Sequence, residues 1–107
     1  MNELVQFLSN GTHPVTATVR NKTREALKES IANGYVLIKF TDTRGGTEVG
    51  FSVDRERSDL RALEGDNGSA EIRLVGDFTL DYVPVTCVAR IDLTTLEGDG
   101  HLEVREK

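Results

Sequence analysis

The chain has 107 residues, of which 37% are apolar and 29% are charged, and this length and composition predict one globular domain over residues 1–107. Because it lacks an apolar run of about 18 residues and has a single cysteine, the sequence excludes a membrane-spanning helix and an intrachain disulfide. Its net charge of −5 disfavours nucleic acids and anionic membranes as partners, and its first residues carry an acid where a secretory signal needs bases, so we expect a cytoplasmic protein.

The chain begins with a short apolar cluster at residues 4–8, which fits either one helical turn or an edge strand. Residues 15–20 then alternate between apolar and polar side chains, as is typical of a strand with one buried face. Val15, Ala17 and Val19 are predicted to point inward, and the residues between them outward.

Residues 23–33 predict the main helix. Thr23 can accept a hydrogen bond from the free amides of the first turn, and Asn33-Gly34 can end the helix in a left-handed conformation. The apolar stripe is narrow, so this helix can cover only part of a sheet. The stripe consists of Ala26, Leu27, Ile31 and Ala32.

Residues 35–42 and 47–54 predict a hairpin, because both stretches alternate and a short glycine-containing break separates them. The break ends in Gly45-Gly46, and we expect a positive φ at one of these glycines. The inward-facing side chains of the hairpin are predicted to be Val36, Ile38, Phe40, Val49, Phe51 and Val53.

The middle of the chain is less regular. Residues 58–63 fit either a short capped helix or a strand, and residues 65–68 form a predicted turn. From Ala70 to Leu80 the apolar residues stay in one alternating phase, and Gly76-Asp77 does not interrupt it. A two-residue turn at this pair would set polar residues opposite apolar ones, so a continuous strand or a bulge is favoured there.

Residues 78–93 form the longest β-like run, and their alternation changes parity near Pro84. Apolar residues fall at even numbers up to Tyr82 and at odd numbers from Val83 onward, which predicts one central strand that is kinked or bulged between Tyr82 and Pro84. Four residues share the apolar face beyond the kink and are predicted to be buried: Val85, Cys87, Ala89 and Ile91.

The chain closes with a predicted turn over residues 96–100 and a strand over residues 101–105, in which Leu102 and Val104 face inward. Because nearly all connections are short, the predicted fold is α+β, a mainly antiparallel, curved sheet of five to six strands with one main helix packed on it. One narrow helix cannot cover such a sheet, which therefore either curls into a partial barrel or meets another subunit.

Residues that could hold a metal or act as a nucleophile are sparse. His13 and His101 lie far apart, and no histidine–cysteine pair has the spacing of a zinc site. Cys87 falls at an inward position of its strand, where a thiol is usually an inert packing residue. We therefore predict no metal site, no cofactor and no catalytic residue.

Arg90 and Asp92 are the most suggestive polar residues, because they share one side of the predicted central strand with Thr86. Neighbours two positions apart on one strand face can form an ion pair. One interpretation is a sheet face that meets water, which is common in antiparallel sheets. The other is a polar floor inside a cup formed by the curved sheet, in which Tyr82, Thr86, Arg90 and Asp92 bind a ligand.

The sequence leaves two classes of function open. The first is a non-enzymatic binding or assembly module, a homodimer that associates through a second apolar face made by Phe78, Leu80 and Tyr82. The alternative is a small-molecule-binding pocket or a small enzyme inside the curved sheet, with Arg90 and Asp92 at its polar floor. The lack of a persuasive acid–base or nucleophile set favours the first class.

Overall fold

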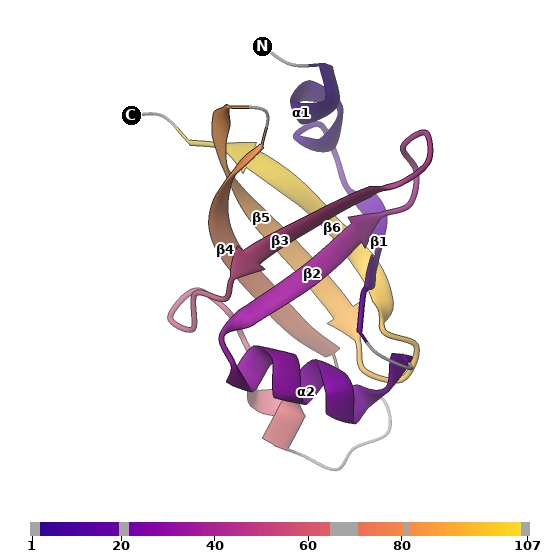
Figure 1. Cartoon of the computed structure of the whole chain (residues 1–107), viewed down its shortest axis with the longest axis vertical. Coiled ribbons are helices and arrows are strands. Elements are labelled where there is room, and N and C mark those ends of the chain that lie inside the picture. Colours follow the sequence, from indigo (N-terminus) through magenta and orange to yellow (C-terminus); the bar gives the residue numbers. More distant parts are fainter. Residues whose placement is uncertain (1–2, 20–21, 65–70, 81, 106–107) are drawn as a thin grey trace.

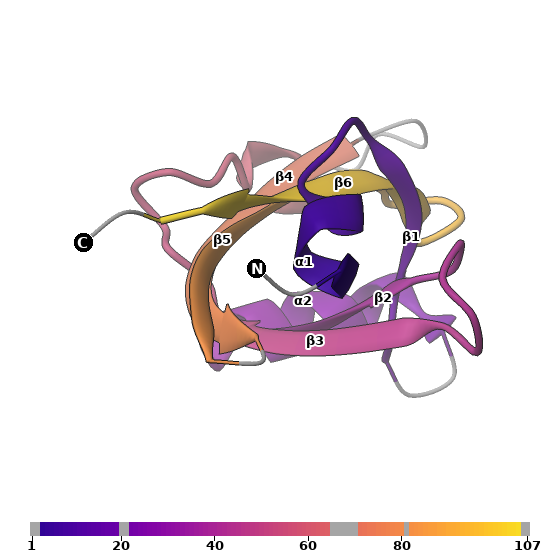
Figure 2. The ribbon, with the colours of Figure 1, turned by 90° about the horizontal axis from the view of Figure 1, so that it is seen from above.

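The computed structural model describes residues 3–19, 22–64, 71–80 and 82–105. Six strands form one antiparallel sheet in the order β3-β2-β1-β6-β5-β4, and this sheet curls into a nearly closed barrel (Figures 1 and 2). The predicted α+β fold with a curved antiparallel sheet is therefore confirmed. The elements in chain order are α1 (Glu3–Leu8), β1 (His13–Ala17), α2 (Arg24–Ala32), β2 (Tyr35–Phe40), β3 (Thr47–Ser52), the 3₁₀ helix η2 (Arg61–Glu64), β4 (Glu71–Leu80), β5 (Val83–Asp92) and β6 (Glu97–Val104).

Helices close both ends of the barrel. α1 lies across one opening, where Val5 and Leu8 are buried, and α2 lies across the other, where Leu27 and Ile31 are buried (Figures 1 and 2). The apolar cluster at residues 4–8 is thus helical, which decides between the two alternatives that the sequence left open. No helix within the described ranges combines the length and the apolar character that crossing a membrane requires.

The predicted main helix is confirmed, with its signals at both ends. Thr23 Oγ1 accepts a hydrogen bond from the Ala26 amide at 3.1 Å, which satisfies a free donor of the first turn. Beyond the other end, Gly34 has a φ of 88°. Arg55 adds a contact that the sequence did not indicate, because its guanidinium donates to the Ile31 carbonyl at 2.9 Å. The same carbonyl accepts a hydrogen bond from the Gly34 amide at 2.8 Å, so Arg55 adds a second contact at the C-terminus of α2, where carbonyls lack partners within the helix.

The predicted hairpin is confirmed as β2 and β3. The two strands pair antiparallel along their whole length, and the alternation places the expected side chains in the core. Both turn glycines have positive φ, 74° at Gly45 and 80° at Gly46, as a tight reversal requires. Val53, just beyond β3, is partly buried against the core.

The predicted single strand over residues 78–93 is wrong, because this stretch contains a hairpin turn. β4 ends at Leu80, β5 begins at Val83, and these two residues are cross-strand partners. Tyr82 in the turn has a φ of 68°, the left-handed conformation typical of two-residue hairpin loops. Partners in a ladder share a face, so the inward positions change from even numbers on β4 to odd numbers on β5. The change of parity therefore marks a turn and not a kink.

β4 runs without interruption through Gly76-Asp77, which confirms the preference for a continuous strand there. Ala70 and the predicted turn at residues 65–68 lie outside the described residues. The apolar even-numbered residues of β4 all pack in or against the core, and they are Ile72, Leu74, Phe78 and Leu80.

Residues 58–63 combine features of both alternatives that the sequence left open. Asp59 forms an isolated antiparallel bridge to Arg73, with backbone hydrogen bonds of 2.9 and 3.0 Å. The 3₁₀ helix η2 begins only two residues later, at Arg61. This bridge fixes the loop after β3 against the free edge of β4.

The predicted turn at residues 96–100 is wrong, because β6 already covers most of it. The actual turn lies just before β6, where the Asp92 carboxylate accepts a hydrogen bond from the Thr94 amide at 2.7 Å. Gly98 lies within β6, and a Cβ at this position would overlap the Arg90 carbonyl of β5. The glycine therefore permits a close approach of two strands instead of a reversal of the chain.

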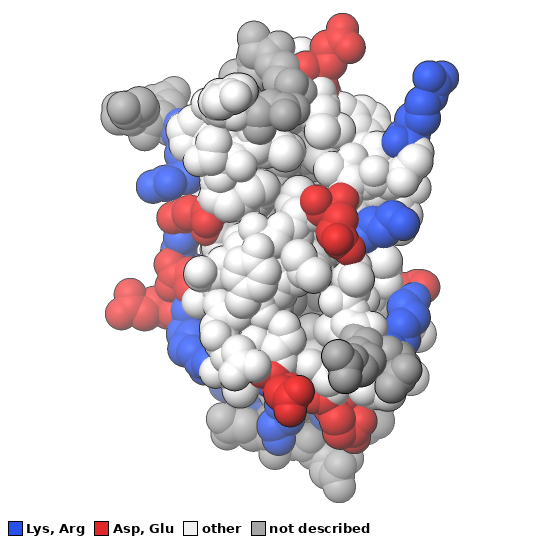
Figure 3. Space-filling view, viewed as in Figure 1, with Lys and Arg blue, Asp and Glu red and all other residues white. Residues whose placement is uncertain are grey.

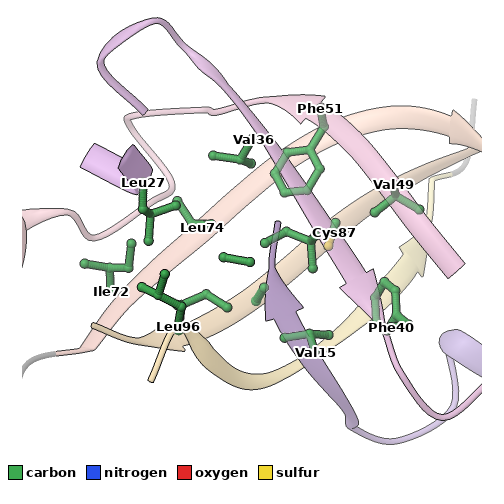
Figure 4. Packing of buried hydrophobic residues seen from close by; sticks show 14 of the residues in the cluster. Val15, Leu27, Val36, Phe40, Val49, Phe51, Ile72, Leu74, Cys87 and Leu96 are labelled. Atoms are coloured by element: carbon green, nitrogen blue, oxygen red, sulfur yellow. The ribbon is translucent and has the colours of Figure 1, made fainter. Parts of the chain in front are cut away.

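The interior of the barrel is filled by apolar side chains from all six strands and both α-helices (Figure 4). At the seam between the edge strands β3 and β4, the rings of Phe51 and Phe78 stack with centroids 5.8 Å apart. The Asp54 amide donates across the same seam to the Val75 carbonyl at 2.7 Å. The predicted inward face of β5 is confirmed by four fully buried residues, Val85, Cys87, Ala89 and Ile91.

Candidate functional site

The structure places the four predicted ligand-binding residues outside the barrel and does not bring them together. Tyr82 is 98% exposed near the tip of the β4–β5 hairpin, whereas Thr86 is buried and donates to the Asp77 carboxylate at 2.6 Å. Asp92 closes the turn after β5, and Arg90 is exposed. The inside of the curved sheet, where the polar floor was expected, is packed with apolar side chains.

Arg90 pairs with Asp99 of β6, so the predicted ion pair between Arg90 and Asp92 is wrong. Nε and Nη2 of Arg90 each donate to one Asp99 carboxylate oxygen at 3.3 Å, and the two residues are cross-strand partners. Hydrogen bonding to Asp99 raises the pKa of the Arg90 guanidinium above its usual value. Arg90 therefore remains charged on the outer face of the sheet.

On its other side, Arg90 faces Arg73 of β4. These two arginines are direct cross-strand partners, so one row across the outer face contains Arg73, Arg90 and Asp99. Like charges directly opposite each other destabilise a ladder. No carboxylate in the described residues forms an ion pair with Arg73. Arg73 instead interacts electrostatically with the Asp59 carboxylate, whose pKa it helps to lower. The row thus carries one guanidinium that is paired with a carboxylate beside one that has no such direct pair in the described residues.

A hollow of about 310 Å³ adjoins this pair, and we call it the Arg73–Arg90 hollow. Val88 and the backbone of Gly100 contribute apolar lining, while Arg73, Arg90 and Asp99 contribute the charged groups. Its volume lies at the lower end of the range for small-molecule sites, which also combine apolar lining with a few polar groups. The chemistry of this hollow suits a small anion that has an apolar part.

Three further arginines lie near Arg73, but each has a structural role. Arg55 caps α2, and Arg57 forms ion pairs with two aspartates at 2.7 and 2.9 Å. Arg61 forms an ion pair with Asp59 at 2.9 Å. The hydrogen bonds from the Arg61 side chain are the main reason that the pKa of Asp59 is lowered to about 2. These contacts give each of the three guanidiniums a hydrogen-bonded partner, whereas no hydrogen bond joins the Arg73 guanidinium to another described side chain.

The two histidines are engaged in separate contacts. His13 is buried, with Nδ1 2.8 Å from an Asp42 carboxylate oxygen and Nε2 3.1 Å from the Asn10 carbonyl oxygen. His101 Nε2 lies 2.9 Å from a carboxylate oxygen of Glu103. In the part of the chain that the structure describes, no cluster of three or more potential ligands is arranged to hold a metal ion.

We expect Cys87 to be unreactive in the folded protein. Burial raises the pKa of its thiol to about 12, and only the thiolate is a strong nucleophile. At pH 8 the native protein should react with a disulfide reagent at least about a hundredfold more slowly than the protein in denaturant. The absorbance of the thiolate that the reagent releases measures the reaction rate of the native and of the denatured protein. Rapid modification of the native protein would instead show that this face of β5 is accessible.

Sequence reasoning missed Arg73 as a partner of Arg90, because it treated residues 78–93 as one strand. The one available signal was the change of apolar parity at Val83, which a hairpin turn also produces. A turn that sets Leu80 opposite Val83 also sets Arg73 opposite Arg90, because the ladder keeps one register. Recognising the turn would therefore have identified the pair.

Fold and site together define the class of molecule: a small antiparallel barrel, closed at its ends by helices, with an arginine-lined hollow on its outer surface. No protein-family model matches the sequence, and no curated protein matches it either. Similarity therefore adds neither a family nor an activity to this geometry.

Proposed function

We propose that the protein is a non-enzymatic binding module that holds a small anionic ligand in the Arg73–Arg90 hollow. The observation that carries this proposal is the cross-strand pairing of Arg73, which has no ion-pair partner in the described residues, with Arg90. A carboxylate or phosphate group between the two guanidiniums would replace a repulsive contact with charge-assisted hydrogen bonds.

The lining of the hollow defines the class of ligand further. Val88 and Gly100 offer apolar surface beside the charged groups, so a ligand with an apolar body gains more than a bare inorganic ion. The hollow is too small for a large ligand, and the net charge of −5 disfavours extended polyanions. We therefore favour a small molecule that carries one carboxylate or phosphate group on an apolar body.

A nuclear magnetic resonance titration at low salt tests the proposal, with phenyl phosphate and inorganic phosphate as probes. Backbone amide shifts should saturate, should be largest around Arg73, Arg90 and Gly100, and should show tighter binding of phenyl phosphate. Low salt is needed because an exposed charge is screened beyond about 10 Å at 0.1 M salt. Absence of saturable shifts with both probes would overturn the proposal.

Arg73→Gln should weaken phenyl phosphate binding at least about tenfold, since a hydrogen bond to a charged group contributes about 1.5–3 kcal/mol. The matched control is Arg44→Gln, which removes the same charge from an exposed residue in the turn between β2 and β3. The control should bind like the wild type. Equal weakening in both variants would show a general electrostatic effect and not a site at Arg73.

A further inference from the structure

The outer face of the β2–β3 hairpin lies on the opposite side of the barrel from β5 and β6 (Figures 1 and 2). Tyr35 and Leu37 are 49% and 36% exposed on this face. Figure 3 looks directly at β2 and β3 and shows a broad uncharged area over them. Neighbouring exposed apolar side chains in an uncharged area can mark a contact with another protein.

Gly50 lets the two apolar side chains extend across both strands. It is the cross-strand partner of Leu37, and a Cβ at this position would overlap the Tyr35 hydroxyl and lie 2.8 Å from Leu37 Cδ2. The side chains of Tyr35 and Leu37 therefore extend over β3 as well as β2. We call the surface formed by Tyr35, Leu37, Lys39, Glu48 and Gly50 the Tyr35–Leu37 face.

Lys39 and Glu48 supply the charges of this face. They are cross-strand partners, yet they form no ion pair with each other or with any other described residue. The Lys39 side chain instead runs over Gly46, where its Nζ lies 3.3 Å from the place that a Cβ would occupy. The face thus has no net charge, although the chain as a whole carries −5.

We propose that a second copy of the chain docks on the Tyr35–Leu37 face in a twofold arrangement. A twofold contact uses the same patch on both copies, so Lys39 of each copy can lie opposite Glu48 of the other. Tyr35 and Leu37 would then pack beside these charge pairs, further along β2. A face without net charge is also where two acidic chains repel each other least. The contact is independent of the anion-binding function proposed above.

This surface differs from the one that the sequence indicated. Phe78 and Leu80 are turned toward the core, so of the second apolar face expected on residues 78–82 only Tyr82 remains fully exposed. The β4–β5 hairpin, which places Phe78 and Leu80 on the same inner face as Val83 and Val85, therefore removes most of that candidate interface. The Tyr35–Leu37 face retains two neighbouring apolar side chains and a self-complementary pair of charges.

Sedimentation equilibrium from about 1 to 200 µM protein tests the docking, because a dimer forms by mass action. The mass of the wild type should rise from 11.8 kDa toward twice that value. Leu37→Glu should weaken association at least about tenfold, whereas Tyr82→Glu, a change at an exposed apolar residue elsewhere, should not. A wild-type mass of 11.8 kDa at every concentration, or disruption by Tyr82→Glu alone, would overturn the proposal.

A charge exchange tests the twofold pairing itself and does not depend on an apolar substitution. Lys39→Glu leaves two acids on each face and Glu48→Lys leaves two bases, so each variant alone should associate about tenfold more weakly than the wild type. An equimolar mixture of the two should recover the dimer, because acids then meet bases. Circular dichroism confirms that both variants are folded. A mixture that stays monomeric while the wild type dimerises would overturn the arrangement.

Discussion

Ile91→Ala should lower the free energy of unfolding by about 2–5 kcal/mol, the range for truncating a large buried aliphatic side chain. Ile91 is fully buried in the barrel, and its cross-strand partner on β4 is the equally enclosed Ile72. Removing three carbons there leaves a cavity among side chains that the closed sheet holds in place. Guanidinium chloride unfolding, followed by circular dichroism, measures the loss.

Val88→Ala is the matched control, because it shortens an aliphatic side chain on the outer face of the same strand. Val88 is only partly buried, so this change should cost well under half of the loss for Ile91→Ala. Both substitutions lie on β5 and leave its backbone pairing unchanged. They differ in whether the shortened side chain lies on the inner or the outer face of the strand. Equal losses would contradict the assignment of the inner face of β5.

Gly76→Val should destabilise the protein by about 1–3 kcal/mol, the usual cost of forcing extra atoms into a packed region. A Cβ at Gly76 would overlap the Phe51 ring and the Ser52 carbonyl of β3. The carbonyl belongs to the backbone and the ring is stacked on Phe78, so neither can move without opening the seam. Thermal unfolding should show the loss as a lower melting temperature.

Gly50→Val is the matched comparison, because Gly50 is also a strand glycine that neighbouring atoms crowd. There the overlapping atoms are the ends of the Tyr35 and Leu37 side chains, which are exposed and can rotate away. We expect a smaller loss than for Gly76→Val, measured at low protein concentration so that association does not contribute. If Gly50→Val were the more destabilising change, close approach at the β3–β4 seam would not limit stability.

The sequence alone determined the elements whose signals lie within a few residues of one another. Thr23 and Gly34 bound α2, and the alternation on both sides of Gly45-Gly46 produces the β2–β3 hairpin. In these cases the cap, the turn and the apolar period are local properties of the chain. The inward face of β5 was predictable for the same reason, since Ile91 and its neighbours keep one parity.

The β4–β5 turn could not be recognised from its residues, because Tyr82 is not a usual turn residue. A left-handed conformation is unfavourable for a bulky side chain, and here the long ladder on either side of the turn holds it. Conversely, Gly98 resembled a turn signal but lies in β6, where the nearby Arg90 backbone leaves no room for a side chain. In both places the packing of strands against each other outweighed local preference.

The tertiary structure alone decided which side chains meet across the sheet. The sequence assigned Arg90 to a polar face, but only the register places it between Arg73 and Asp99 instead of beside Asp92. The β4–β5 turn likewise placed two apolar series of opposite parity, which include Leu80 and Ile91, on one interior face. The physical reason is that a strand's parity is local, whereas its partner depends on where the chain turns, and a shift of one residue reverses the face.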